Sequence, residues 1–129
     1  MVDEGVLRIE LIEAKFNHDL ETFGKMDPYV HFQIREEEWT SKECKNGGKH
    51  PHWVEMGGNV WECKIHYFGD DVKFKCMDKE VLKDRPIGEG EAKLSALCCD
   101  GGMDEWYPVF HEGKEEGKIH IKAHYTKNE

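Results

Sequence analysis

Hydrophobic and polar residues alternate with a period of two along much of the chain. In the first such segment, Leu7, Ile9 and Leu11 are hydrophobic and the residues between them are mostly polar or charged. Because successive side chains of a strand point to opposite faces, this alternation predicts strands with one buried face. The predicted strands cover residues 6–14, 29–34, 39–44, 60–67, 72–77, 87–94, 105–110 and 118–125. Helix is predicted only at residues 93–99, for one or two turns.

Short strands separated by turn residues are typical of an all-β protein, an eight-stranded antiparallel β-sandwich. The length of 129 residues is close to that of one ordinary domain, so we expect a single domain over residues 1–129. Two predicted connections are long, at residues 15–26 and 45–59. Long loops on a compact sandwich are candidate functional sites, although a tolerated insertion would give the same pattern.

The charge balance restricts the classes of partner. Asp and Glu outnumber Lys and Arg by 27 to 18, which gives a net charge of -9. Such a surface repels nucleic acid and anionic lipid, which argues against unaided binding to either, so we expect no nucleic-acid partner. Carboxylates are compatible with a cation site. No hydrophobic run approaches the roughly 20 residues of a membrane span, so no transmembrane segment is expected.

Five cysteines, an odd number without repeated spacing, indicate reduced thiols. The first residues, at 1–5, are acidic and lead into no long hydrophobic run, so no signal peptide is predicted. Together these features predict a cytoplasmic protein, with a peripheral membrane location also open.

Four motifs in order resemble those of the C2 domain family. They are Asp27-Pro28-Tyr29-Val30, Gly58-Asn59-Val60-Trp61 with Ile65 and Tyr67, Met77-Asp78-Lys79-Glu80, and Ile87-Gly88-Glu89. The resemblance extends over residues 5 to about 125 and implies a Greek-key sandwich. The chain starts at the strand before the Asp-Pro loop and ends with a segment, at 117–121, similar to the strand that opens other C2 domains. This order implies the circularly permuted type II topology, as in small stand-alone C2 proteins of plants and protists.

The resemblance implies a calcium site between loops at one end of the sandwich, where carboxylates supply the oxygen ligands that Ca²⁺ prefers. Carried over residue by residue, the candidate ligands are Glu21, Asp27, Asp78, Glu80 and Asp84. Glu21 and Glu80 stand where Asp is usual, and Arg85 stands at the last ligand position with Asp84 beside it. The alternative is a degenerate site in which these acids pair with Lys25, Lys83 and Arg85.

Apolar and basic residues at the predicted loop tips suggest contact with a membrane or a partner protein. The candidates are Phe23, Lys25, Lys49, Trp53, Val81, Leu82 and Lys83. Leu20 and Met26 lie in the same first loop, but we expect these two side chains to fold back and cap the core.

The sequence therefore predicts a binding module rather than an enzyme, because it lacks motifs such as Gly-x-Ser-x-Gly or a phosphate loop. One hypothesis is calcium-dependent binding to an anionic phospholipid membrane. The other is a calcium-independent protein-interaction subunit of a larger assembly. A zinc site would need Cys44, His50, His52 and Cys63, whose spacing matches no compact zinc motif.

Overall fold

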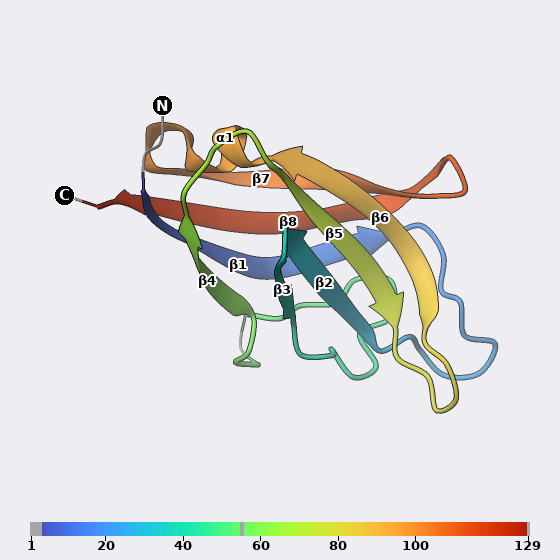
Figure 1. The fold of residues 1–129 in the computed structure, drawn as a ribbon. Coiled ribbons are helices and arrows are strands. Elements are labelled where there is room, and N and C mark those ends of the chain that lie inside the picture. Colours follow the sequence, from blue (N-terminus) through green and yellow to red (C-terminus); the bar gives the residue numbers. More distant parts are fainter. Residues whose placement is uncertain (1–3, 55, 129) are drawn as a thin grey trace.

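A computed structural model describes residues 4–54 and 56–128 of the chain, and most of them lie in β-strands (Figure 1). The strands are β1 (Gly5–Phe16), β2 (Pro28–Ile34), β3 (Glu37–Thr40), β4 (Val60–Ile65), β5 (Asp71–Asp78), β6 (Arg85–Lys93), β7 (Gly102–His111) and β8 (Lys114–Lys127). A short helix, α1 (Leu94–Cys98), follows β6. The predicted all-β fold with antiparallel strands is confirmed. Within the described ranges, no helix has the length and hydrophobicity needed to cross a membrane.

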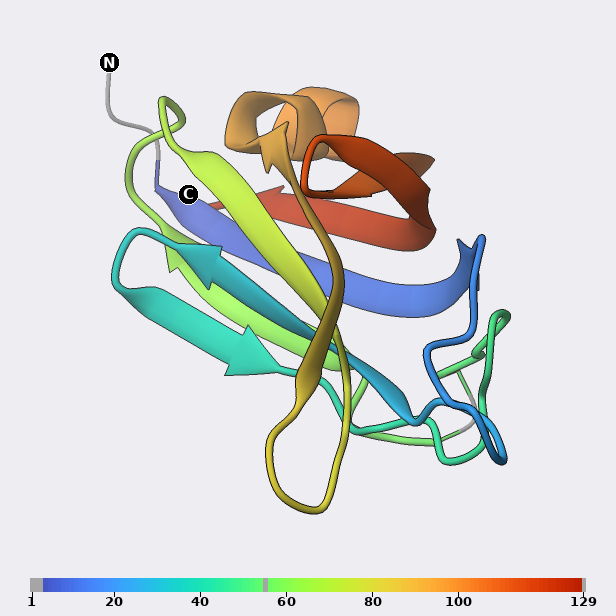
Figure 2. The same ribbon diagram turned by 90° about the vertical axis from the view of Figure 1, so that its right-hand side faces the viewer.

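The strands form two layers (Figure 2). The hydrogen-bonded order is β3-β2-β5-β6-β7-β8-β1-β4, but β6 pairs with β7 only through Glu89 and Phe110. This weak junction divides the order into two halves of four strands. The outermost strands of the halves meet across the sandwich, where the rings of Trp39 on β3 and Trp61 on β4 stack with centroids 6.3 Å apart.

The permuted topology expected from the sequence is also present. The loop that ends at Asp27 joins β1 to β2, and the last strand, β8, pairs with β1 from Gly5 to Phe16. The Gly5 end of this pairing lies at one end of the sandwich, and the loops after β1 and β5 lie at the other (Figure 1). The candidate site therefore belongs to the end remote from Gly5.

The alternating pattern of the sequence produces the core. Leu7, Ile9 and Leu11 of β1 are fully buried, as are Ile119 and Ile121 of the neighbouring strand β8. Because each strand has a period of two, the residues between them point outward and carry the charges of the surface. The predictions for β1 and β8 are confirmed at the level of individual side chains.

The bounds of most strands differ from the predicted ones, and two differences change where side chains lie. The strand expected at residues 39–44 is shifted, since β3 ends at Thr40 and the chain leaves the regular ladder while still donating from the Ser41 amide to the Val30 carbonyl. The strand expected at 60–67 ends at Ile65. Tyr67 is therefore half exposed instead of facing the core, and the Arg35 guanidinium lies 5.3 Å from the centre of its ring.

The cysteines behave as the sequence suggests. All five are free thiols, and Cys63, Cys76 and Cys98 are buried in the core. Burial raises the pKa of Cys63 to about 12 and that of Cys98 to about 11. Because the thiolate is the reactive form, these buried thiols are chemically inert in the folded protein, and Cys99 is the exposed one.

Candidate functional site

Three loops meet at one end of the sandwich, at residues 17–27, 41–59 and 79–84 (Figures 1 and 2). Asp27 joins them. Its backbone amide donates to Oδ1 of Asp78 (2.9 Å), and its carbonyl accepts from the Lys79 amide (3.1 Å). Its own Oδ1 accepts from the Asn46 amide of the second loop (2.7 Å). The Asp-Pro signature thus acts as a structural junction that fixes the loops relative to one another.

Three of the five predicted calcium ligands are brought together by these loops. One carboxylate oxygen from each of Glu21, Asp78 and Glu80 lies within 4.8 Å of the other two. The same cluster holds a cation of the protein itself, because Nη2 of Arg85 contacts all three acids. It lies 2.8 Å from Oε1 of Glu80 and 3.3 Å from Oδ2 of Asp78, and it also pairs with Oε2 of Glu21.

Electrostatics explain why this cluster needs a cation. The Asp78 side chain is only 1% exposed, and burial raises the pKa of its carboxyl above the ordinary value. Glu21 adds to this rise, whereas the hydrogen bonds from Asp27 and Arg85 oppose it. Burial alone would lower the pKa of Arg85, but Glu21 and Glu80 raise it above its usual range. Arg85 therefore stays charged and offsets part of the negative charge of the cluster.

The other two predicted ligands lie outside this cluster. Asp84 accepts from the Glu80 amide at Oδ1 (2.9 Å) and from the Tyr29 hydroxyl at Oδ2 (2.5 Å). These two hydrogen bonds hold the pKa of the Asp84 carboxyl below its usual value. Asp27 is engaged with the Asn46 amide, as described above. The carboxylates of Asp27 and Asp84 therefore accept hydrogen bonds from protein groups and hold the loops together.

The arrangement of these residues does not fit Ca²⁺. Calcium takes six to eight oxygen ligands at about 2.3–2.6 Å, and here the guanidinium of Arg85 lies among the carboxylates that would supply them. Nε of Arg85 is buried and has no hydrogen-bond partner among the described residues. A donor in this position repels a cation, so calcium could enter only if Arg85 moved away. Calcium binding by this chain stays a prediction.

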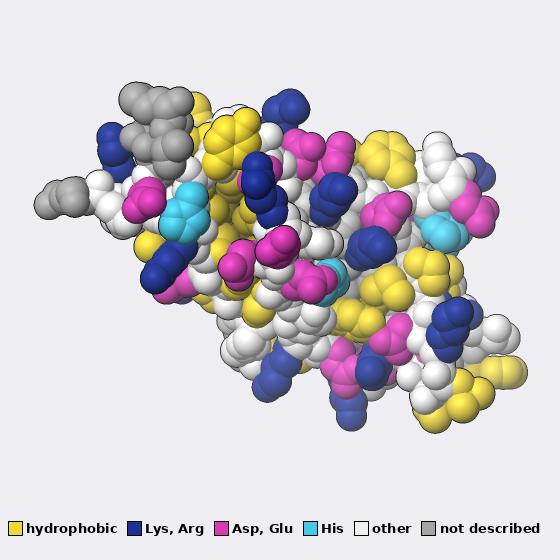
Figure 3. Space-filling view, viewed as in Figure 1, with side chains coloured by type: hydrophobic (Ala, Val, Ile, Leu, Met, Phe, Trp, Pro, Cys, Tyr) yellow, Lys and Arg dark blue, Asp and Glu magenta, His cyan; other side chains and the backbone are white. Residues whose placement is uncertain are grey.

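Exposed hydrophobic side chains project from the tips of two of the loops. Phe23 is 90% exposed, Val81 99% and Leu82 98%. Figure 3 shows hydrophobic side chains protruding at its lower right, where Figure 1 places the ends of these loops. Lys25 and Lys83 are exposed beside them. The structure thus leaves these five predicted contact residues available to a partner.

The remaining loop residues considered in the sequence differ in their exposure. Met26 is fully buried and Leu20 packs partly against the core, as expected. Lys49 is exposed, and its carbonyl accepts from the Phe16 amide (2.7 Å). The prediction that Trp53 contacts a membrane or partner is wrong. Its side chain is fully buried, and its ring Nε1 donates to the Lys42 carbonyl (2.9 Å).

A β-sandwich with charged and exposed hydrophobic residues gathered on loops at one end defines a class of binding domain. The C2 domain family profile matches residues 5–109, and the chain belongs to this family. Extended synaptotagmin-3 of Xenopus tropicalis is 28% identical over 128 residues, which cover 94% of this chain and 14% of that protein. Elicitor-responsive protein 3 of Oryza sativa subsp. japonica is 25% identical over 95% of this chain and 84% of its own length.

Solved structures agree with the fold. A structure of the two tandem C2 domains of extended synaptotagmin 2 superposes with a TM-score of 0.80 at 26% identity, covering 97% of this chain and 42% of that one. The chain matches only a small part of the extended synaptotagmins. The fold also occurs within human GIVD cytosolic phospholipase A2, at 14% identity over 17% of that chain with a TM-score of 0.80. The expectation that this protein is not an enzyme therefore stays a prediction.

Proposed function

We propose that this C2 domain is a peripheral membrane-binding module that inserts Phe23, Val81 and Leu82 into a phospholipid bilayer without requiring calcium. The near-complete exposure of these three side chains at one end of the sandwich supports this function most directly. Large hydrophobic residues grouped on a protein surface mark sites of interaction with membranes or other proteins. Here they occupy loop tips, a shape suited to penetration of a bilayer rather than to packing on a flat partner.

Energetics favour insertion. Moving a Val, Leu or Phe side chain from water to a hydrocarbon environment contributes about 1.5–3 kcal/mol. Three such side chains provide a gross gain of about 4.5–9 kcal/mol, part of which offsets the loss of freedom on binding. Lys25 and Lys83, which are exposed next to these residues, are suited to contact lipid phosphates.

The proposed independence of calcium rests on Arg85. In a calcium-dependent domain the ion neutralises the carboxylates that would otherwise repel lipid phosphates. In this chain Arg85 already pairs with Glu21, Asp78 and Glu80. A calcium-bound form of the extended synaptotagmin 2 domains has the same fold, with a TM-score of 0.77 at 24% identity. The fold is thus compatible with calcium, and the residues at the loop end decide whether the ion is used.

Vesicle co-sedimentation tests the proposal. The protein is expected to pellet with vesicles of phosphatidylcholine and a minor share of phosphatidylserine in EGTA, and calcium should change the bound fraction little. The triple variant Phe23→Ser/Val81→Ser/Leu82→Ser should lose at least about 100-fold in vesicle affinity, because it removes most of the inserted hydrophobic surface. Tyr67→Ser is the control, since Tyr67 is a half-exposed aromatic residue that lies between β4 and β5, at the other end of the sandwich.

Two results would contradict the proposal. Pelleting that requires calcium would show that the ion displaces Arg85 and drives membrane binding. No pelleting in either condition would favour the protein-interaction alternative. Circular dichroism of each variant separates loss of binding from loss of folding.

A further inference from the structure

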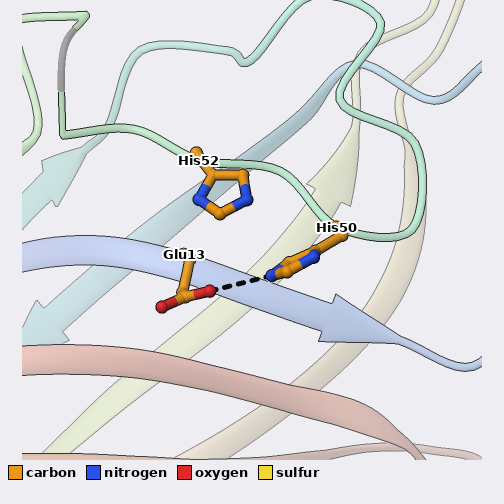
Figure 4. Close-up of side chains that lie close together, drawn as sticks. All are labelled: Glu13, His50 and His52. Atoms are coloured by element: carbon orange, nitrogen blue, oxygen red, sulfur yellow. Dashed lines mark hydrogen bonds and ion pairs between the residues drawn. The ribbon is translucent and has the colours of Figure 1, made fainter.

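A second cluster of potential metal ligands lies away from the acidic loops. Glu13 on β1 and His50 and His52 in the β3–β4 loop place one ligand atom each within 4.8 Å of one another. Figure 4 shows both imidazole rings on the same side of β1 as the Glu13 carboxylate. Nε2 of His50 donates to Oε1 of Glu13 (2.8 Å), and the two imidazole centroids are 4.4 Å apart.

The backbone holds these three residues in place. The segment at 49–53 runs along the edge of β1, with the Ala14 amide donating to the Pro51 carbonyl (3.1 Å) and the Trp53 amide to the Ile12 carbonyl (2.9 Å). Glu13 and His52 form an isolated antiparallel bridge. In an extended segment, residues two apart share a face, so His50 and His52 both point toward Glu13. The buried ring of Trp53 anchors the end of the segment.

The Glu13 carboxylate is also oriented from its other side. A β-bulge after Leu11 places Glu13 opposite His120 of β8. Nδ1 of His120 lies 3.1 Å from Oε2 of Glu13, and its Nε2 is hydrogen-bonded to Asp104. The chain Asp104–His120–Glu13 fixes one carboxylate oxygen and leaves the other facing His50. Residues that hydrogen-bond to a ligand in this way are the usual support of protein metal sites.

We propose that Glu13, His50 and His52 form a binding site for Zn²⁺ or a similar first-row transition metal ion. Two imidazoles and one carboxylate are a recurrent zinc donor set that leaves the fourth position open to water or another ligand. Nothing in this site depends on the acidic cluster around Arg85, so it is independent of the proposed membrane function. Calcium is not the expected ion, because imidazole nitrogen suits zinc, copper or nickel better.

The present distances require only side-chain adjustment. Bonds of about 2.0–2.2 Å in a tetrahedral site separate neighbouring ligand atoms by about 3.3–3.6 Å. The ligand atoms lie within 4.8 Å of one another, so their separations must close by at most about 1.2–1.5 Å, and the hydrogen bond from His50 to Glu13 must give way to the ion. His50 and His52 are exposed, so rotation of their rings provides this movement while the backbone stays in place.

Isothermal titration with ZnCl₂ at pH 7.5 tests the site. The Cys44→Ser/Cys99→Ser background removes the two thiols outside the buried set, so that cysteine binding does not contribute. One equivalent of zinc should bind to the background protein. His50→Gln, His52→Gln and Glu13→Gln should each weaken the zinc affinity at least about 100-fold, which is as much as or more than the loss expected when a residue that supports a ligand is changed. His120→Gln should weaken it about 10–100-fold. Bound zinc should also raise the melting temperature of the background protein.

The chain offers a matched control. Nδ1 of His18 lies 3.0 Å from Oε2 of Glu116, a pair with the same chemistry but without a second histidine. His18→Gln should leave zinc affinity unchanged. The proposal is overturned if the background protein binds no zinc, or if the affinity survives in His50→Gln/His52→Gln. An equal loss of zinc affinity in His18→Gln and in the site variants would also overturn the proposal, because zinc would then bind surface histidines generally.

Discussion

Replacing Arg85 by Gln is expected to give a protein that calcium stabilises. The change removes the cation from among Glu21, Asp78 and Glu80 and leaves the buried Asp78 carboxylate without its main charge partner. In EGTA the variant should therefore melt at a lower temperature than the wild type. At millimolar calcium an ion can take the vacated place, and binding to the folded state alone should raise its melting temperature by about 5–10 °C.

Arg35→Gln is the matched control for this experiment. Arg35 also forms a close pair with a carboxylate, since its Nε lies 2.6 Å from Oδ2 of Asp70, but it belongs to the other end of the sandwich. Its loss should lower the melting temperature slightly and create no response to calcium. Differential scanning fluorimetry in EGTA, Mg²⁺ and Ca²⁺ measures all three proteins. A wild type that calcium stabilises as strongly as the Arg85 variant would show that the guanidinium does not exclude the ion.

Trp53→Ala should be the most damaging single substitution in the loops. The indole is fully buried, and truncation of a buried Trp typically costs about 3–5 kcal/mol of stability. The Lys42 carbonyl, which accepts from Nε1 of Trp53, would in addition lose its donor. Urea unfolding followed by circular dichroism gives the change in the free energy of unfolding.

Trp106→Ala provides the comparison. Trp106 is only partly buried and stacks on His120 on the outer face of β7 and β8, with centroids 4.9 Å apart. Its loss should cost less than about 2 kcal/mol, because less surface is removed from contact. Equal destabilisation by the two substitutions, or a stable Trp53→Ala protein, would show that the second loop does not depend on its tryptophan. Zinc affinity should fall in Trp53→Ala, since this residue anchors His52.

The sequence predicts the strands well where one face of a strand is buried. In β1 and β8 the alternation of hydrophobic and polar residues matches the alternation of buried and exposed side chains. The buried residues Leu11 and Ile121 are paired across the two strands. The prediction for Trp53 is wrong because its loop is rich in glycine and has no periodic pattern from which burial could be inferred. Only the hydrogen bonds of this segment to the edge of β1, which join distant parts of the chain, take its side chain inside.

The sequence predicts which residues belong to the candidate site but not which of them are in contact. The sequence identifies Glu21, Asp78 and Glu80, and it also places Arg85 at the last ligand position, but spacing alone does not show the guanidinium contacting all three. The cluster of Glu13, His50 and His52 could not be predicted from the sequence for a similar reason. Its third member, Glu13, is 37 residues from His50 in the sequence. Of the two cysteines considered with the histidines, Cys63 faces the core from β4. Strand pairing, not local spacing, creates such contacts.

The proposed membrane insertion is tested most directly by an environment-sensitive fluorophore at the loop tip. Leu82→Cys is labelled in the Cys44→Ser/Cys99→Ser background, where the remaining thiols are buried, and His66→Cys at the other end of the sandwich serves as the control. On addition of phosphatidylcholine vesicles in EGTA, the emission at position 82 should shift to the blue and intensify, and that at position 66 should not. Unchanged emission at position 82, or a shift that appears only with calcium, would contradict calcium-independent insertion.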